Sequence, residues 1–124
     1  MLLKWNFYRI FCQDLFPPHS KFCLCVCPIN QWFLFINENP TISRKAKAFD
    51  LVVDNFRLPF LVYKQSYLPT GAIKTFTDNR VQDALQDERN HLGPIPPSLK
   101  REIVALIEAH PMLEDNRKKV ILAD

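Results

Sequence analysis

The chain is short of glycine, with only two glycines among its 124 residues, whereas it contains ten prolines. Loops that cradle phosphate groups need several glycines, because their backbone must approach the ligand closely. The sequence therefore excludes the glycine-rich nucleotide-binding classes. Its turns must be formed mainly by proline, asparagine and aspartate, which predicts stiff connections between the elements.

Long apolar runs are also lacking, and none approaches the ~20 residues that a membrane-spanning helix needs. In residues 1–20 the apolar positions are interrupted by Lys4, Arg9 and Asp14, and no small-residue cleavage site follows. We predict a protein without a membrane span, in which residues 1–20 form a loose arm or a short amphipathic helix. Two alternatives remain open for this segment: contact with a membrane surface, and a start codon assigned upstream of the folded domain.

The four cysteines lie at positions 12, 23, 25 and 27. Cys23, Cys25 and Cys27 alternate along one strand, where same-face neighbours are ~6.5–7 Å apart and rarely have disulfide geometry. We therefore predict buried thiols in a cytoplasmic protein. The alternative, a soft-metal site at these three cysteines, lacks a second ligand cluster, because His19 is the only nearby imidazole. No metal or other cofactor is expected.

Residues 21–124 are predicted to form a single domain. Strands are expected at 21–27 and 32–37, which form an antiparallel hairpin and are apolar on both faces, and at 48–53. A second hairpin, of strands 60–63 and 72–76, is expected around the turn at Leu68-Pro69-Thr70-Gly71. Helices should follow at about 80–86, at 99–110 with Ser98 as the N-cap, and at 113–122.

These elements predict an α+β fold, either a small bent antiparallel sheet or an SH3-like barrel, followed by C-terminal helices. Residues 92–97 are expected to be a rigid extended linker, because each proline fixes its own backbone and restrains the preceding residue. A single helical layer covers only one face of a sheet. Since the first two strands are apolar on both faces, we expect a homodimer.

The best candidate for a functional loop is the polar segment 38–47, which carries Arg44, Lys45 and Lys47 within four residues. It lies in the basic part of the chain: residues 21–76 contain seven basic and three acidic residues, whereas residues 77–124 contain seven basic and nine acidic ones. A basic loop of this kind is able to hold phosphate groups. The competing interpretation is a solvated connection, which most charged loops are.

Aromatic residues are frequent in the second strand, where Trp32, Phe33 and Phe35 are close together. Such residues stack on nucleobases when one face of a sheet is open, as in proteins that bind single strands. In an apolar sheet they more often belong to the core, and we favour that interpretation.

Two stretches of the second half resemble PemK/MazF-like toxins. Lys64-Gln65-Ser66-Tyr67, followed by Ala72-Ile73-Lys74-Thr75-Phe76 and Val81, is similar to the late strands of that family. Leu92-Gly93-Pro94-Ile95, with the helix behind it, is similar to its closing segment. The resemblance implies a PemK/MazF-like α+β domain at 21–124 that cleaves single-stranded RNA without metal. It further implies a homodimer and a small acidic antitoxin.

The family's catalytic half, with an Arg-Pro pair after a glycine-containing loop, has no counterpart here, since no glycine precedes Gly71. In the corresponding loop the resemblance points to Arg44, Thr41 and Ser43 as the catalytic residues. Arg44, Lys45, Lys47 and Lys64 are the predicted nucleic-acid-binding residues. Two hypotheses follow: a PemK/MazF-like endoribonuclease, and a non-catalytic module of the same architecture that holds nucleic acid or a protein through loop 38–47.

Overall fold

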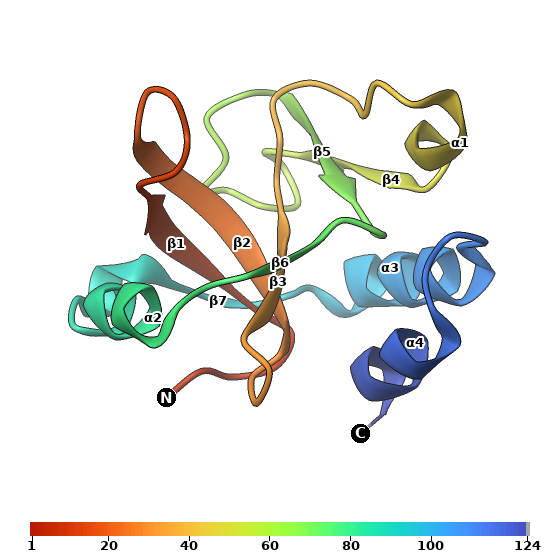
Figure 1. The fold of residues 1–124 in the computed structure, drawn as a ribbon. Coiled ribbons are helices and arrows are strands. Elements are labelled where there is room, and N and C mark those ends of the chain that lie inside the picture. Colours follow the sequence, from red (N-terminus) through yellow and green to blue (C-terminus); the bar gives the residue numbers. More distant parts are fainter. Residues whose placement is uncertain (124) are drawn as a thin grey trace.

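The computed structural model describes residues 1–123 and contains two antiparallel sheets and four α-helices. The larger sheet has five strands in the order β6-β3-β2-β1-β7, and the smaller one pairs β4 with β5. Figure 1 shows the order of these elements in space. The strands of the larger sheet are β1 (Asn6–Cys12), β2 (His19–Cys27), β3 (Trp32–Phe35), β6 (Ile73–Thr75) and β7 (His91–Pro94), and those of the smaller sheet are β4 (Asp50–Asp54) and β5 (Gln65–Pro69).

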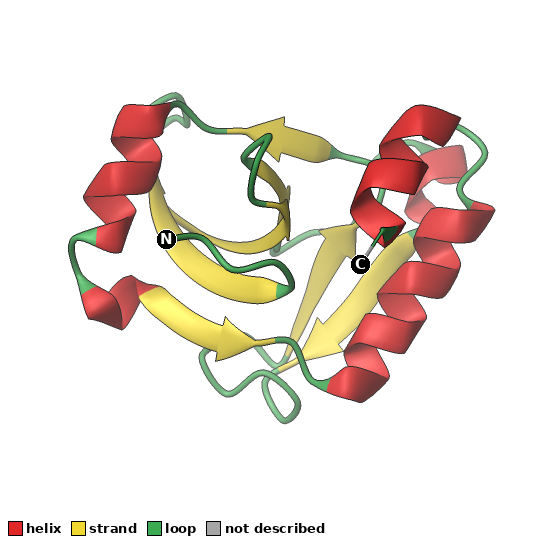
Figure 2. Cartoon of the chain, turned by 90° about the horizontal axis from the view of Figure 1, so that it is seen from below, coloured by secondary structure: helices red, strands yellow, loops and turns green. Residues whose placement is uncertain are grey.

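The helices are α1 (Arg44–Lys47), α2 (Asp78–Leu85), α3 (Pro97–Ala109) and α4 (Asp115–Leu122), and a 3₁₀ turn covers Glu88–Asn90. This mixed content confirms the predicted α+β class. Figure 2 shows the strong curvature of the strands, with α2 on one side and α3 and α4 on the other. The strands among residues 1–123 do not close into a barrel, so of the two predicted architectures the bent sheet applies.

The central strand β2 faces a hydrophobic core on each side of the sheet. Leu24 and Val26 pack in a core with side chains from β4, β5, α3 and α4. Cys23 and Cys25, which point the other way, pack in a second core with Val81 of α2. Alternate residues of a strand point to opposite faces. The apolar character of every position in 23–27 therefore follows from burial on both sides, as predicted.

Residues 1–20 contain an internal strand of the main sheet, and the prediction of a loose arm or short helix is wrong. β1 pairs with β2 along six residues and with β7 on its other edge. Phe7, Tyr8 and Ile10 are each only 1% exposed. Its first partner, β2, follows after residues 13–18, so β1 and β2 form a hairpin, whereas its second partner, β7, lies far along the chain. The folded domain therefore begins before residue 21, and the last residue of the predicted range, Asp124, lies outside the described residues.

The segment 60–63 does not form the predicted strand. Leu58 and Leu61 are buried from a loop, in which the amide of Leu61 donates to the carbonyl of Leu58 at 3.0 Å. The strand after it, β5, begins at Gln65 and pairs with β4, whereas β6 pairs with β3. The turn at Thr70–Gly71 consequently connects two different sheets and does not close a hairpin.

The expected linker 92–97 also differs, because β7 (His91–Pro94) extends the sheet beside β1. Gly93 has a φ of +104°, a value that side chains disfavour, and the register of β1 and β7 shifts at this point. The longest helix, α3, agrees with the predicted 99–110 but begins at Pro97, where proline is favoured in the first turn, and Ser98 is not its N-cap.

Both ends of the chain lie on the lower side of the fold in the view of Figure 1. The Lys4 Nζ donates to the carbonyl oxygens of Ala123 at 2.5 Å and Val120 at 3.3 Å, which are terminal carbonyls of α4. A cation at a helix C-terminus is favourable, because the final carbonyls have no partner within the helix. None of the helices within residues 1–123 has the length and apolar character needed to cross a membrane.

Candidate functional site

A large hollow lies between loop 37–46 and the turn that connects β5 to β6. It has a volume of about 620 Å³, and residues from four stretches of the chain form its walls. We call it the Thr41 pocket. Its lining includes two lysines, several hydrogen-bonding side chains and a histidine: Lys21, Asn37, Glu38, Asn39, Thr41, Lys74 and His110. Polar groups of this kind around a mixed apolar surface are typical of ligand-binding sites.

Thr41 is held in a fixed orientation by Asp50 at the start of β4. Its hydroxyl donates to Asp50 Oδ1 at 2.6 Å, and its backbone amide donates to Oδ2 at 2.7 Å. Both carboxylate oxygens of Asp50 are therefore engaged by one residue. This pair fastens loop 38–47 to the smaller sheet, and it fixes the wall of the pocket that Thr41 forms.

Two lysines lie beside the partly exposed ring of Phe35. The ammonium nitrogen of Lys21 lies 5.7 Å from the centroid of this ring, and that of Lys74 lies 6.0 Å from it. Lys21 also donates to Asn37 Oδ1 at 2.8 Å, and burial lowers its pKa. Among residues 1–123 neither lysine forms an ion pair with a carboxylate. Both positive charges are consequently available to an anionic ligand.

His110 forms part of the floor of the Thr41 pocket and is 4% exposed. Its ring packs on Phe49 with centroids 4.6 Å apart, and its Nδ1 accepts from the amide of Met112 at 3.2 Å. Burial and the charge of Lys118 lower the pKa of His110. The imidazole is therefore neutral at pH 7, and its hydrogen sits on Nε2, because Nδ1 acts as an acceptor.

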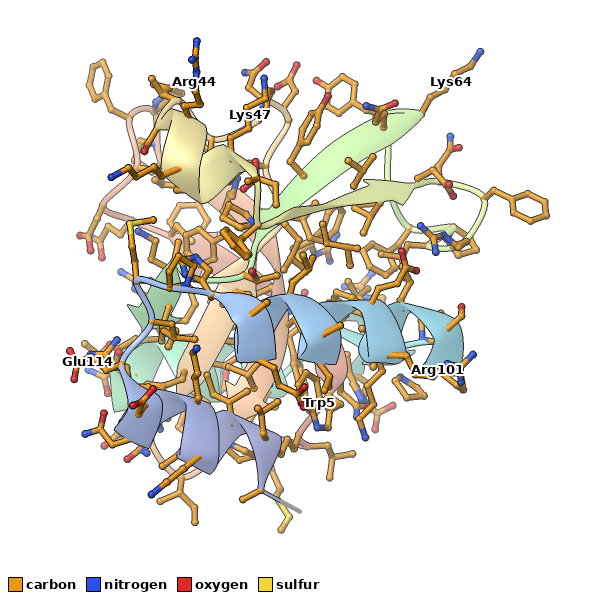
Figure 3. The ribbon with its side chains drawn as sticks, turned by 90° about the vertical axis from the view of Figure 1, so that its right-hand side faces the viewer. Trp5, Arg44, Lys47, Lys64, Arg101 and Glu114 are labelled. Carbon is orange, nitrogen blue, oxygen red and sulfur yellow. The ribbon has the colours of Figure 1, made fainter. Side chains whose placement is uncertain are left out.

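The predicted cations of loop 38–47 are on the short helix α1. Arg44, Lys45 and Lys47 are all exposed, and Figure 3 shows Arg44 and Lys47 pointing away from the body of the protein. Ser43 precedes α1 and makes no capping hydrogen bond with its side chain. Of the predicted catalytic residues, only Thr41 lines the pocket. Ala46 also lines it, so α1 borders the pocket, with its cations directed to the solvent.

Lys64 is separate from this group. It precedes β5, and Figure 3 places it at the end of the smaller sheet remote from Arg44 and Lys47. The predicted nucleic-acid-binding residues therefore do not form one patch: three of them lie on α1, beside the pocket, and Lys64 stands apart.

Sequence reasoning missed Lys21 and Lys74 as site residues. A signal for Lys21 was present, because it is a cation in an otherwise apolar strand and lies in alternation with Cys23 and Cys25. Its neighbour Phe35 had been considered as a stacking residue. Phe33, by contrast, is fully buried, as the core interpretation predicted. The burial of the four free cysteines was likewise predicted.

The cysteines do not form a reactive or metal-binding centre. Burial raises the pKa of the Cys25 thiol to about 12, and it raises that of Cys23 as well. Within residues 1–123, no three His, Cys, Asp or Glu side chains gather closely enough to hold a metal ion. Comparison of the chain with protein-family models, with curated proteins and with solved structures finds no match.

Proposed function

We propose that this protein binds single-stranded RNA in the Thr41 pocket and over the adjacent ring of Phe35. The observation that carries the proposal is the position of Lys21 and Lys74, both within about 6 Å of the partly exposed ring of Phe35, at the edge of the Thr41 pocket. Proteins that bind single strands combine cations that contact the phosphates with aromatic faces on which bases stack. Charge and a stacking surface are both present here.

The basic loop supports the same function from beside the pocket. The cations of α1 offer charge without an aromatic face or a hollow, so they suit the positioning of phosphates and not the recognition of bases. The arrangement agrees with the hypothesis of a non-catalytic module that binds through loop 38–47. In this module loop 38–47 forms the outer wall of the site, and the strands β2, β3 and β6 form its base.

Replacement of Lys74 by alanine is expected to weaken RNA binding about tenfold, the order expected when a hydrogen bond to a charged group is lost. Lys74 is exposed, so the substitution should leave the fold intact. The measurement is the fluorescence anisotropy of a labelled, unstructured RNA of about twelve nucleotides at low salt. Because the phosphate contacts are electrostatic, the affinity should also fall as the salt concentration rises.

The matched control is Lys119→Ala, which removes an equally exposed lysine from α4, away from the pocket. It should change the affinity far less than Lys74→Ala. Lys45→Ala, on α1 beside the pocket, should give an intermediate loss. Equal effects of Lys74→Ala and Lys119→Ala would contradict the proposed site, and an absence of RNA binding by the unmodified protein would contradict the function.

RNA cleavage is the second candidate function, and the proximity of Glu38 to Lys21 favours it. Both residues line the Thr41 pocket, and the carboxylate of Glu38 acts electrostatically on the Lys21 ammonium group. A carboxylate base would take the proton of the ribose 2′-hydroxyl, whose oxygen then attacks phosphorus. The 5′-oxygen would leave with a proton taken from water, giving a 2′,3′-cyclic phosphate, and Lys21 would stabilise the charge on the phosphorane. Arg44 would take part only if its exposed side chain turned towards the pocket.

Induction of the protein in cells separates the two candidates. An endoribonuclease should cause growth arrest with fragmentation of cellular RNA, and Glu38→Gln should abolish both effects. If cellular RNA stays intact and growth is normal, and the protein binds RNA in vitro, the endoribonuclease is excluded and the binding module is supported. Arrest that survives Arg44→Ala would remove Arg44 from the mechanism, and arrest that survives Glu38→Gln would remove Glu38.

The PemK/MazF resemblance extends the proposal to partners. A homodimer and a small acidic antitoxin remain predictions, as does the cytoplasm, where four free thiols would stay reduced. The apolar strand faces from which the homodimer was inferred are buried within the chain itself, by α2 on one side and by the smaller sheet with α3 and α4 on the other. Support for the homodimer therefore comes from the resemblance alone.

A further inference from the structure

Two smaller hollows continue from the Thr41 pocket, and a cation lies at each junction. Lys74 lines both the Thr41 pocket and the next hollow, which has a volume of about 290 Å³ and is formed in part by Phe35; we call it the Phe35 pocket. Arg80 and Phe11 line both the Phe35 pocket and a third hollow of about 280 Å³, the Arg9 pocket. The three hollows therefore form a row.

The aromatic rings in this row lie next to the cations. Phe35 packs on Phe76 with centroids 5.7 Å apart, and Lys74 stands over Phe35. Farther along, the guanidinium carbon of Arg80 lies 5.8 Å from the centroid of Phe11, whose side chain is 46% exposed. The combination of a cation and a ring occurs twice, once at each junction. Such a repeat matches the alternation of phosphate and base in a nucleic acid strand.

We propose that a single RNA strand occupies all three hollows, with successive phosphates held by Lys74 and Arg80 and with bases placed on Phe35 and Phe11. The proposal rests on the RNA-binding function and extends it, because it requires a ligand long enough to span all three hollows. Only a single strand fits this arrangement, since the bases of a duplex are paired and stacked on each other and cannot lie on protein rings.

Carboxylates along the row should lower the affinity for RNA, because they repel its phosphates. Removal of one of them should therefore strengthen binding, whereas removal of a cation should weaken it. Glu38 lines the first hollow, Asp14 the second and Asp83 the third. Asp83 lies 3.9 Å from Arg80 in a partly exposed ion pair. A phosphate at Arg80 must compete with this carboxylate. Removal of the Asp83 charge should therefore strengthen binding of a strand that reaches Arg80, and should leave a shorter strand unaffected.

The experiment measures the affinities of labelled oligouridylates of two, four, six and eight nucleotides. The unmodified protein should show a steep gain in affinity between two and four nucleotides. Arg80→Gln, which removes the positive charge but keeps a polar side chain, should weaken binding of the eight-nucleotide RNA about tenfold and leave the dinucleotide unchanged. It should also reduce the slope of log affinity against log salt by about 0.7, the value for one phosphate of a single strand. Asp83→Asn should increase affinity for the longer RNAs.

Arg101→Gln is the matched control, because Arg101 is exposed on α3 (Figure 3), whereas Arg80 is on α2 at the opposite side of the strands (Figure 2). Suppose that binding depends on Lys74 but that Arg80→Gln and Arg101→Gln have equal effects at every RNA length. This result would overturn the three-hollow site and leave the proposed function standing. Affinity that no longer rises beyond two nucleotides would overturn it as well. Failure of every oligonucleotide to bind would contradict both proposals. Equal affinity for the matching DNA would contradict a preference for RNA and show that the site binds single strands of both kinds.

Discussion

Phe7→Ala is expected to lower the free energy of unfolding by about 3–5 kcal/mol, the usual cost of removing a large buried aromatic side chain. Phe7 is 1% exposed in the core that contains the smaller sheet and α3, and its ring lies 5.3 Å from that of Phe60, centroid to centroid. Since small domains are stable by only about 5–15 kcal/mol, this single change removes a large share of the total. Deletion of residues 1–12 should prevent folding altogether, because β2 and β7 would both lose β1, the strand between them.

Urea denaturation monitored by circular dichroism measures the effect, and Phe56→Ala is the control. Phe56 is the same residue type but is 90% exposed, so its replacement should change stability by no more than about 0.5 kcal/mol. A loss below 1 kcal/mol for Phe7→Ala, or a cooperative unfolding transition in the chain that lacks residues 1–12, would show that the N-terminal segment is an accessory arm after all.

Gly71→Ala is expected to cost about 1–3 kcal/mol, which is typical of overpacking. A Cβ at this position would lie 2.8 Å from His110 Cδ2 and Cε1 and still closer to Nε2. His110 cannot easily move, because its ring packs on Phe49 and its Nδ1 accepts from Met112. The same change would displace the floor of the Thr41 pocket, so the proposed RNA binding should weaken along with stability.

A double-mutant cycle with His110→Ala identifies the cause. In the His110→Ala background Gly71→Ala should cost little, because the clashing ring is gone, and the coupling energy should approach the full cost of the single change. Gly93→Ala is the comparison. A Cβ there meets nothing within 4 Å, but the φ of +104° is unfavourable for alanine, so its cost should be the same with or without His110. A coupling near zero between Gly71 and His110 would refute the steric explanation.

Local sequence patterns were sufficient for several of the elements whose partners are close in the chain. The hairpin of β2 and β3 was predictable, because two apolar runs flank a four-residue turn. The helices α2, α3 and α4 were predictable from apolar spacing and helix-terminating residues. The sequence analysis placed five strands in residues 21–76, and the structure also has five, β2 to β6, although residues 60–63 are not among them.

β1 was missed although its hairpin partner β2 follows after residues 13–18, and only its second partner is distant. β1 pairs with β7, more than eighty residues away, and local propensity contains no information on such a pairing. In the same way, the runs at 60–63 and 72–76 have strand-like composition, yet 60–63 buries Leu61 from a loop and β6 joins the other sheet. Composition measures the tendency of a residue to be buried, and burial is compatible with either structure.

The sequence by itself determined the α+β class, the two-sided burial of the cysteine strand and the presence of a basic loop with accessible charge. Only the tertiary structure decided which cations lie next to an aromatic ring and a pocket, and which stand alone. Pairing of β2, β3 and β6 brings Lys21, Phe35 and Lys74 together, although they are up to 53 positions apart in the chain. Lys64, which the sequence grouped with the loop cations, lies at the other end of the smaller sheet. The physical reason is that charge and hydrophobicity belong to single residues, whereas a site depends on strand order and register, which long-range packing fixes.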